Sequence, residues 1–295
     1  DVFGREVPKW KAAAPIIDGN PGELSPICIS VKLSALYSQT SVLNFEHSVE
    51  VISKHLETIA RKAKQVNGLI YVDAEDVNNN VIIYEVFKRV FLSSEFRDFP
   101  YPGIVLQAYA RDSDQRLDDL INFAKQRGAP IAVRLVKGAY WDYETISSHQ
   151  HHWHSPLFSK KQSSDAQYEK LSRVMIDNYQ HLLPAFGSHN IRSLCHAICY
   201  ARSKKLTNKD YELQMLYGMA DPIAQAFTAD DHLVRLYVPL GDMIPGMGYL
   251  VRRLLENTSN ESFLRHTFYD ESEVENLLQQ PAFDPSDQLK SNGGG

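Results

Sequence analysis

Cysteine is scarce in this sequence, with three residues, Cys28, Cys195 and Cys199, among 295. A small, odd number argues against a disulfide scaffold and favours a reducing compartment. Cys195 and Cys199 stand four positions apart around His196, a spacing that a metal site could use. We expect instead two small apolar residues on the buried face of a helix, because free cysteine packs as a small hydrophobe.

Long apolar runs and an excess of basic charge are also missing. No run reaches the ~18–20 apolar residues that a membrane helix needs, and the first five residues show no signal-peptide pattern. The net charge of −5 gives no reason to expect nucleic-acid binding. No G-x-G-x-x-G follows the first expected strand, so a Rossmann dinucleotide site is unsupported. These absences leave an ordinary globular domain.

The sequence does contain a regular alternation of short β-rich runs with helical patterns. The expected strands are Ile27–Leu33, Leu69–Asp73, Ile104–Tyr109, Ile131–Val136, Leu183–Phe186, Tyr211–Leu216 and Leu233–Val238. The expected helices are Asn44–Gln65, Val81–Leu92, Arg116–Gln126, Ala166–Leu182, Ile191–Lys204, Pro222–Ala229 and a helix after Gly248. This alternation indicates a parallel sheet, and the apolar strands indicate that both of its faces are covered.

Seven such units fit either a doubly wound sheet or a (β/α)8 barrel. Polar side chains at nearly every strand end favour the barrel, because those ends converge where active sites lie, whereas an open sheet concentrates function at one switch point. They are Lys32, Asp73-Ala74-Glu75, Gln107, Arg134 with Lys137, Ser188-His189, Gln214 and Tyr237. Seven strands are one fewer than a complete barrel needs.

The two ends of the chain differ in composition from the rest. Residues 1–26 hold three prolines and are expected to be loop, with a short helix near Trp10–Ala14. The tail, residues 267–295, ends in Ser-Asn-Gly-Gly-Gly, which resembles a linker left by cloning. Nothing in residues 1–26 is convincing as an eighth strand, so we expect an irregular or truncated barrel.

The stretch GYLVRRLLEN, from Gly248 to Asn257, predicts a helix with a charged stripe. Tyr249, Arg252, Arg253 and Glu256 fall at i, i+3, i+4 and i+7, on one face. One interpretation is a solvated face with a weak Arg252–Glu256 ion pair. The other is a site for a small zwitterion, in which the arginines bind a carboxylate, the glutamate faces an ammonium and the tyrosine covers an apolar ring.

A cluster of histidines surrounds Trp153, at His149, His151, His152 and His154. No cysteine or carboxylate lies among them, so we expect a solvated loop and predict no metal site.

Eight motifs occur in order along the chain. They are SVKLSAL (Ser30–Leu36), YVDAED (Tyr71–Asp76), VLQAYAR (Val105–Arg111), VRLVKGAYWD (Val133–Asp142), SHN (Ser188–Asn190), YELQMLYGM (Tyr211–Met219), RLYVPLG (Arg235–Gly241) and YLVRRLLEN (Tyr249–Asn257). The series closely resembles the proline dehydrogenase domain of the bacterial bifunctional proline utilization A flavoenzymes, over roughly residues 27–266. The resemblance implies an α/β fold, a distorted (β/α)8 TIM-like barrel with bound FAD. The family's first strand, followed by Met-Leu-Gly-Glu, is not found.

The same resemblance implies an activity and its partners. It implies oxidation of L-proline to Δ1-pyrroline-5-carboxylate, by hydride transfer from proline C5 to flavin N5, with electrons passed to a membrane quinone. It also implies inhibition by analogues such as tetrahydrofuran-2-carboxylate, and a cytoplasmic bacterial protein that binds a membrane peripherally. The family's DNA-binding module and aldehyde dehydrogenase half are not found in these 295 residues, so no nucleic-acid partner is expected.

Matching positions assign the substrate contacts. The resemblance places Lys32, Arg252 and Arg253 on the proline carboxylate, which guanidinium groups bind in bidentate fashion. It places Asp73 and Glu256 near the proline nitrogen, where a carboxylate favours the cation and can manage its proton. The proline ring would be enclosed by Tyr140, Leu216, Tyr237 and Tyr249. Taken singly, Lys32 could form a strand-end ion pair, Asp73 could cap a turn, and each tyrosine could be core.

The resemblance assigns the cofactor contacts in the same way. Arg134 would lie near flavin N5 and stabilise negative charge on the reduced ring, and the small Gly138 and Ala139 would let backbone approach closely. The expected FAD contacts are Asp73, Gln107, Arg134, Val136, Lys137, Gly138, Ala139, Trp141, Ser159, Lys161, Ser188, His189, Asn190, Gln214, Tyr237 and Glu256. The residues expected to be catalytic are Lys32, Asp73, Arg134, Tyr237, Arg252, Arg253 and Glu256.

Two other hypotheses stay open from the sequence. One is a flavin-free lyase or aldolase that uses Lys32 or Lys137 as a Schiff-base amine. The other, motivated by the missing strand, is a binding module that holds proline analogues without turnover.

Overall fold

The described part of the chain forms a large curled sheet of seven parallel strands with helices outside it. The computed structural model describes residues 16–17, 20–21, 27–66, 68–240, 247–248, 251 and 279–288. The strands pair in sequence order, β3-β4-β5-β6-β7-β8-β9, and every pair is parallel. The predicted α/β barrel-like fold is confirmed, and each of the seven expected strands is present.

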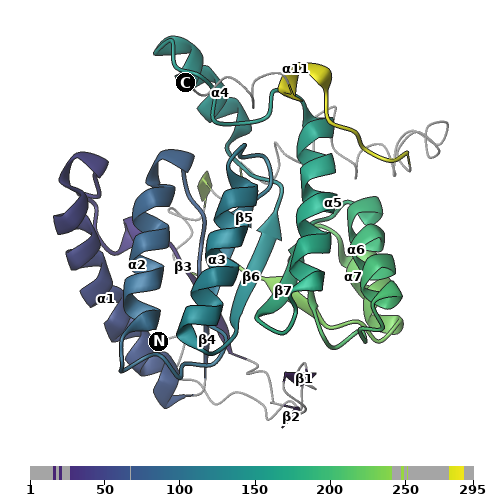
Figure 1. Ribbon diagram of the computed structural model, residues 1–295, viewed down its shortest axis with the longest axis horizontal. Coiled ribbons are helices and arrows are strands. Elements are labelled where there is room, and N and C mark those ends of the chain that lie inside the picture. The colour runs from purple at the N-terminus through teal and green to yellow at the C-terminus, as the bar shows by residue number, and fades with distance from the viewer. Residues whose placement is uncertain are drawn as a thin grey trace.

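The elements follow the expected alternation (Figure 1). The strands of the large sheet are β3 (Cys28–Val31), β4 (Leu69–Val72), β5 (Gly103–Gln107), β6 (Ile131–Val136), β7 (Leu182–Gly187), β8 (Glu212–Leu216) and β9 (Val234–Tyr237). The helices are α1 (Phe45–Gln65), α2 (Asn80–Leu92), α3 (Ser113–Arg127), α4 (Trp141–Gln150), α5 (Lys161–Asp177), α6 (Ile191–Ser203), α7 (Asp221–Ala229) and α11 (Pro285–Gln288). Short 3-10 turns are η1 (Leu33–Ala35), η2 (Val42–Asn44) and η3 (Val77–Asn79).

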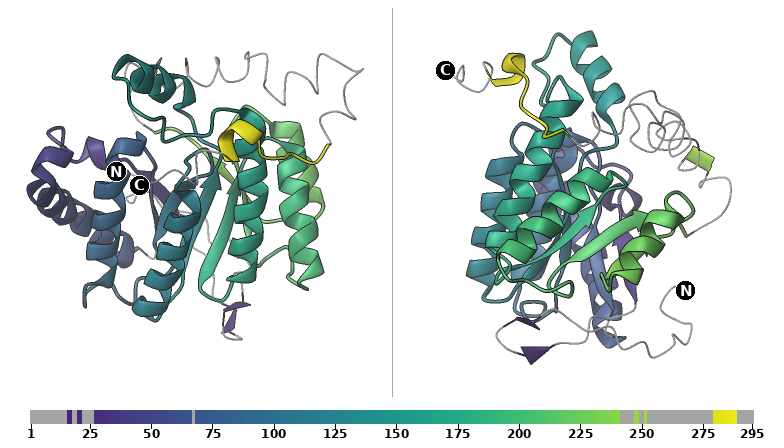
Figure 2. Two further views of the ribbon diagram at one scale, coloured as in Figure 1. Left: turned by 45° about the horizontal axis from the view of Figure 1, so that its top comes forward. Right: turned by 90° about the vertical axis from the view of Figure 1, so that its right-hand side faces the viewer.

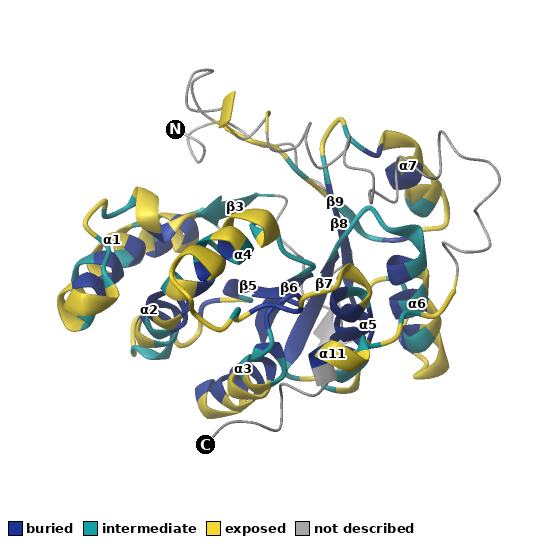
Figure 3. Cartoon of the chain, turned by 90° about the horizontal axis from the view of Figure 1, so that it is seen from above, coloured by how far each residue is buried: buried dark blue, intermediate teal, exposed yellow. Residues whose placement is uncertain are grey.

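Side-chain contacts across the sheet show how strongly it curls. Tyr237 is the last residue of β9, yet its hydroxyl donates to Asp73, which directly follows β4, at 2.9 Å. In a flat sheet these strands would be five spacings apart, about 24 Å at ~4.8 Å per strand. The sheet is therefore rolled so that its second strand, β4, and its last strand, β9, approach each other. Figures 2 and 3 show the helices arranged in an arc outside it.

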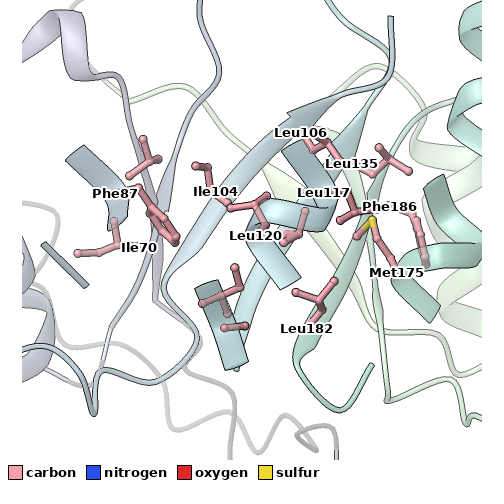
Figure 4. Close-up of a cluster of buried hydrophobic side chains, with 14 of the residues drawn as sticks. Ile70, Phe87, Ile104, Leu106, Leu117, Leu120, Leu135, Met175, Leu182 and Phe186 are labelled. Carbon is pink, nitrogen blue, oxygen red and sulfur yellow. The ribbon is translucent and has the colours of Figure 1, made fainter. Parts of the chain in front are cut away.

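The main core lies between the outer face of the sheet and the helices. Outward-facing residues of the strands meet apolar residues of α2, α3 and α5, as Figure 4 shows. The labelled members of this cluster are Ile70, Phe87, Ile104, Leu106, Leu117, Leu120, Leu135, Met175, Leu182 and Phe186. Each such side chain contributes about 1.5–3 kcal/mol by leaving water.

A second, smaller cluster fills the inside of the rolled sheet. It contains Leu69, Tyr71, Ala132, Leu183 and Ala185, all buried. Successive strand residues point to opposite faces, so each strand supplies one set of apolar residues to the helices and another to the interior. This double burial explains why the strands are nearly continuous apolar runs.

Several expectations about local structure are wrong. Residues 141–150 form α4, a helix that was not expected because its sequence lacks a clean apolar stripe. His149, expected in a loop, lies in this helix. The helix expected to run to Leu182 ends at Asp177, with Asn178 as its C-cap, and Leu182 begins β7. Part of the expected N-terminal loop forms an antiparallel pair, β1 (Ile16–Ile17) with β2 (Asn20–Pro21), at the opposite end from α4 and α11 (Figure 1).

The cysteine expectation is half right. Cys195 and Cys199 lie on the predicted helix, α6, but both are exposed. The buried face of α6 is formed instead by Leu194, Ala197, Ile198 and Ala201. Aliphatic neighbours therefore occupy the positions that face the core.

No helix in the described ranges is both long and apolar enough to cross a membrane. The short helix expected at Trp10–Ala14 lies outside the described residues. So do Tyr249, Arg252, Arg253 and Glu256, although Met247, Gly248 and Val251 are described and helical.

A buried carboxylate ties the C-terminal part of the described chain to the start of α5. Asp287 on α11 is 2% exposed. Its Oδ1 accepts hydrogen bonds from Arg111 Nη2 at 2.5 Å and from the amide and hydroxyl of Ser159, each at 2.9 Å. Burial works to raise the pKa of Asp287, but hydrogen bonds from Ser159, Ser163 and Arg111 outweigh it and lower the pKa to about 2.

This lowered pKa predicts a pH-dependent contribution to stability. An unfolded aspartate titrates near ~3.9, so the stabilisation is complete above that pH and is lost as the pH falls toward 2. We expect Asp287→Asn to lower the free energy of unfolding by about 2 kcal/mol at pH 7, and by less at pH 3. Urea unfolding at both pH values measures this. Asp284→Asn, which removes a half-exposed carboxylate whose Oδ1 accepts only from the neighbouring Ser286 among the described residues, is the control, and an equal loss in both variants would contradict the prediction.

Candidate active site

A cavity of about 310 Å³ opens where the carboxyl ends of the strands meet. Its lining comes from all seven strands of the large sheet or from the residues that directly follow them. The sequence-predicted residues that line it are Lys32, Asp73, Gln107, Arg134, Val136, Lys137, Gly138, Ala139, Tyr140, Ser188, His189, Gln214, Leu216 and Tyr237. Residues that the sequence did not suggest as contacts are Ala74, Val105, Gly187 and Met215.

Arg134 lies at the centre of the polar network in this cavity. Its guanidinium donates to Gln214 Oε1 at 2.6 Å, to Asp73 Oδ1 at 2.8 Å and to Ser30 Oγ at 2.9 Å. These partners stand on or directly after β8, β4 and β3. The guanidinium carbon also lies 4.3 Å from the ring centroid of Tyr71, a cation–π distance. Arg134 is thus a fixed cation, held from several sides of the barrel.

Asp73 is the acceptor that Arg134 shares with Tyr237. Both residues of the Arg134–Asp73 pair are buried, with exposed side-chain fractions of 9% and 10%. Asp73 Oδ1 accepts from Arg134, and Oδ2 accepts from the Tyr237 hydroxyl. A buried carboxylate that accepts from a donor on each oxygen is fixed in its orientation. The structure therefore joins three of the predicted catalytic residues directly.

Gln107 is held by a separate set of contacts. Its Nε2 donates to the Glu75 carbonyl at 3.1 Å and to the Tyr109 hydroxyl at 3.2 Å, while Asn80 Nδ2 donates to its Oε1 at 3.4 Å. Nearby, Glu144 links α4 to η3, because its Oε1 accepts a hydrogen bond from the Val77 amide at 2.8 Å. Burial raises the pKa of Glu144 and of Tyr109.

The turn after β6 brings backbone close to an aromatic ring. Gly138 has φ +134°, and an added Cβ would lie 2.5 Å from the Tyr109 ring. A side chain would therefore both strain the backbone and collide with Tyr109, so only glycine fits here. The neighbouring Lys137 pairs with Asp165 at 2.5 Å, and burial lowers the pKa of Lys137.

Some predicted contacts do not reach the cavity lining. Trp141 Nε1 donates to the Phe158 carbonyl at 3.0 Å, and Asn190 Oδ1 caps α6 by accepting from the Ser193 amide at 3.1 Å. Ser159 binds Asp287, and Lys161 begins α5. Their roles as FAD contacts stay predictions. So do the substrate-binding roles of Tyr249, Arg252 and Arg253 and the substrate and FAD contacts of Glu256, because these four residues lie outside the described ones.

Two charged residues below the cavity were missed from the sequence. Glu212 on β8 is 1% exposed, and Arg235 on β9 binds both of its carboxylate oxygens. The signal for them was available, because Glu212 stands two residues before Gln214 and Arg235 two before Tyr237. Residues two apart on a strand share a face, so both had to point inward.

The charged lining favours an anionic ligand. Lys32, Arg134 and Lys137 are cations, and Asp73 is the anion among the lining residues that the structure describes. Asp165 lies beside Lys137 and neutralises it in part. A cavity of this size, with a few convergent polar groups at strand ends, is typical of a small-molecule site.

The chain is similar to several proline dehydrogenases. The proline dehydrogenase family model matches residues 5–266. The bifunctional protein PutA of Escherichia coli is 30% identical over 260 residues, which are 86% of this chain and 20% of that protein. Proline dehydrogenase 2 of Bacillus subtilis is 26% identical over 222 residues, which are 75% of this chain and 65% of that protein.

A solved structure shows the same likeness in three dimensions. The crystal structure of PutA from Bdellovibrio bacteriovorus, inactivated by N-propargylglycine, aligns with a TM-score of 0.88 and 40% identity, over 94% of this chain and 28% of that one. The chain thus spans between a fifth and a third of the PutA proteins that it matches. With the family model covering most of its length, the chain belongs to the proline dehydrogenase family.

Proposed function

We propose that this chain oxidises L-proline to Δ1-pyrroline-5-carboxylate with bound FAD. Family membership supports the activity. The observation that carries the proposal to this chain is the Arg134 network, a fixed cation at the centre of a cavity at the strand ends. Electron transfer to a quinone, peripheral binding to a membrane in the bacterial cytoplasm and an aldehyde dehydrogenase partner half belong to the proposal through the resemblance.

The residues around the cavity fit a flavin. Arg134 and Lys137 offer hydrogen-bond donors to ring nitrogens and carbonyl oxygens, and Gln107 lines the cavity beside them. The strand-end turn at Gly138–Ala139 lets the backbone approach a flat group. A bound flavin would supply the two-electron hydride acceptor. Arg134 would stabilise negative charge on the reduced ring, because a preorganised cation in a water-poor site needs little reorganisation.

The other residues have distinct roles in the proposal. Lys32 lines the cavity and binds the substrate carboxylate, together with Arg252 and Arg253. Asp73 attracts the amine and orients it, since both of its oxygens are already fixed by donors. Tyr140, Leu216 and Tyr237 line the cavity and exclude water from the proline ring, with Tyr249 and Glu256 assigned from the sequence. Holding the reactants in such a geometry can lower the barrier by several kcal/mol, up to roughly 7–11 in the best cases.

A visible spectrum tests the proposal. The purified chain with added FAD is expected to absorb near ~450 nm, as protein-bound flavins do, and L-proline is expected to bleach that band without oxygen. Tetrahydrofuran-2-carboxylate is the control, because it should perturb the band without bleaching it. A protein that binds no FAD, or a lysine adduct trapped by borohydride with a carbonyl substrate, would contradict the proposal.

A further inference from the structure

Below the cavity, a buried ion pair continues the network that holds Arg134. Glu212 receives two hydrogen bonds from Arg235, to Oε1 at 2.6 Å and to Oε2 at 3.0 Å. Glu212 Oε2 also accepts from Gln214 Nε2 at 2.8 Å. Neither Glu212 nor Arg235 lines the cavity. Gln214 does line the cavity, so it connects the buried ion pair to Arg134 in the cavity lining.

The chemistry of these groups leaves Gln214 one orientation. Its amide has a donating end and an accepting end, whereas arginine can only donate and an ionised carboxylate can only accept. Reversing the amide would turn its NH2 toward Arg134 and its oxygen toward Glu212, leaving buried polar groups unpaired at a cost of ~1–3 kcal/mol for each. Glu212 therefore turns the Gln214 oxygen toward Arg134 Nε, which lies 2.6 Å away.

The ion pair keeps Glu212 in the accepting state. Burial works to raise the pKa of Glu212, but Arg235 outweighs it and the pKa is lowered. Burial works to lower the pKa of Arg235, but Glu212 outweighs it and the pKa is raised. Both groups are charged across the ordinary pH range, so the orientation of Gln214 does not change with pH.

We propose that Glu212 is a positioning residue for Arg134. Glu212 acts through the amide of Gln214, and Arg235 holds Glu212 in place. The catalytic consequence rests on the proposed function, in which Arg134 stabilises charge on the bound cofactor. The structural consequence does not rest on it. Without Glu212, the Gln214 amide can rotate, and Arg134 loses one of its three side-chain hydrogen bonds.

Glu212→Gln tests this proposal, because glutamine keeps the shape but can donate as well as accept. Crystal structures of the cofactor-free wild type and variant are expected to differ in the Gln214 amide and the Arg134 guanidinium. In the loaded enzyme, anaerobic flavin reduction by proline is expected to slow roughly 10- to 100-fold, with KM changed less than about threefold. The reduction potential of the bound flavin should shift as well.

Glu169→Gln is the matched control. Glu169 is 3% exposed and pairs with Arg192 and His196 outside the barrel, so this variant loses the same buried charge without a link to Arg134. We expect its flavin reduction to match the wild type. Equal slowing in both variants would overturn the proposal by assigning the effect to general destabilisation.

A double variant keeps the test decisive if Glu212→Gln fails to fold. Glu212→Met with Arg235→Met removes both charges, and such apolar replacements of buried pairs are often tolerated. It still removes the acceptor for Gln214, so the same displacement of Arg134 is expected. Arg134 and Gln214 unmoved in the cofactor-free crystals would overturn the proposal, whereas a wild type that proline does not reduce would contradict only the proposed function.

Discussion

Arg134→Met is expected to lower kcat/KM for proline oxidation by roughly 10³-fold, the scale of removing one preorganised charge-stabilising group. Methionine fills similar space but donates no hydrogen bonds, so Gln214, Asp73 and Ser30 all lose the guanidinium. Asp73 would also become a buried carboxylate without its ion-pair partner, which weakens its control of the substrate amine. Single-turnover flavin reduction under anaerobic conditions measures the loss directly.

The control for this variant is Arg116→Met. Arg116 on α3 pairs with Asp112 at 2.5 Å and lies 5.1 Å from the Tyr84 ring centroid. It therefore makes an ion pair and a cation–π contact as Arg134 does, but away from the cavity lining. We expect unchanged reduction in Arg116→Met. A folded Arg134→Met protein that reduces flavin at the wild-type rate would remove Arg134 from the reaction.

The strands could be predicted because their apolar runs are a local signal. Each expected strand, from Ile27–Leu33 to Leu233–Val238, overlaps an observed one, and the polar residues named at their ends, except Glu75, line one cavity. The convergence of Lys32, Asp73 and Tyr237 follows from the parallel order of the strands. This part of the candidate site depends on topology, which the alternation of strands and helices determines.

What the sequence did not reveal depends on contacts between distant segments. Asp287 looks like a residue of a polar tail, yet it accepts hydrogen bonds from Ser159, just before α5, across 128 positions. Cys195 and Cys199 were assigned to a buried face that Leu194 and Ile198 fill better. The α4 helix escaped notice because its apolar residues form no stripe. In each case, packing against another element determines the burial or the secondary structure of the segment. The sequence of the segment alone does not indicate which element it packs against.

Arg127 is another residue whose environment the local sequence does not predict. Its position in the last turn of α3 indicates an exposed residue beside the negative end of the helix dipole. Instead it is 2% exposed, and it donates only to backbone carbonyl groups. Its partners are the carbonyls of Phe91, Phe96, Phe99, Ala129 and Pro130. Burial lowers the pKa of Arg127 to about 10, so it is still charged at neutral pH.

Arg127→Met should therefore destabilise the fold strongly. The connection from α2 to β5 has its carbonyls turned inward toward this guanidinium, and methionine would leave several of them buried without a donor, at ~1–3 kcal/mol each. We expect the free energy of unfolding to fall by at least about 4 kcal/mol, and Tm by roughly 10–15 °C, since each kcal/mol shifts Tm by ~2–4 °C in a domain of this size. Calorimetry or thermal circular dichroism measures both.

Arg97→Met is the matched control for this prediction. Arg97 also donates to backbone carbonyls, those of Arg127 and Gln126 at 2.9 Å each, but it is exposed, so water can replace it at the freed groups. Its loss should cost about 1 kcal/mol or less. If the two variants unfold at the same temperature, the carbonyls around Arg127 are satisfied in some other way, and the connection between α2 and β5 does not depend on this side chain.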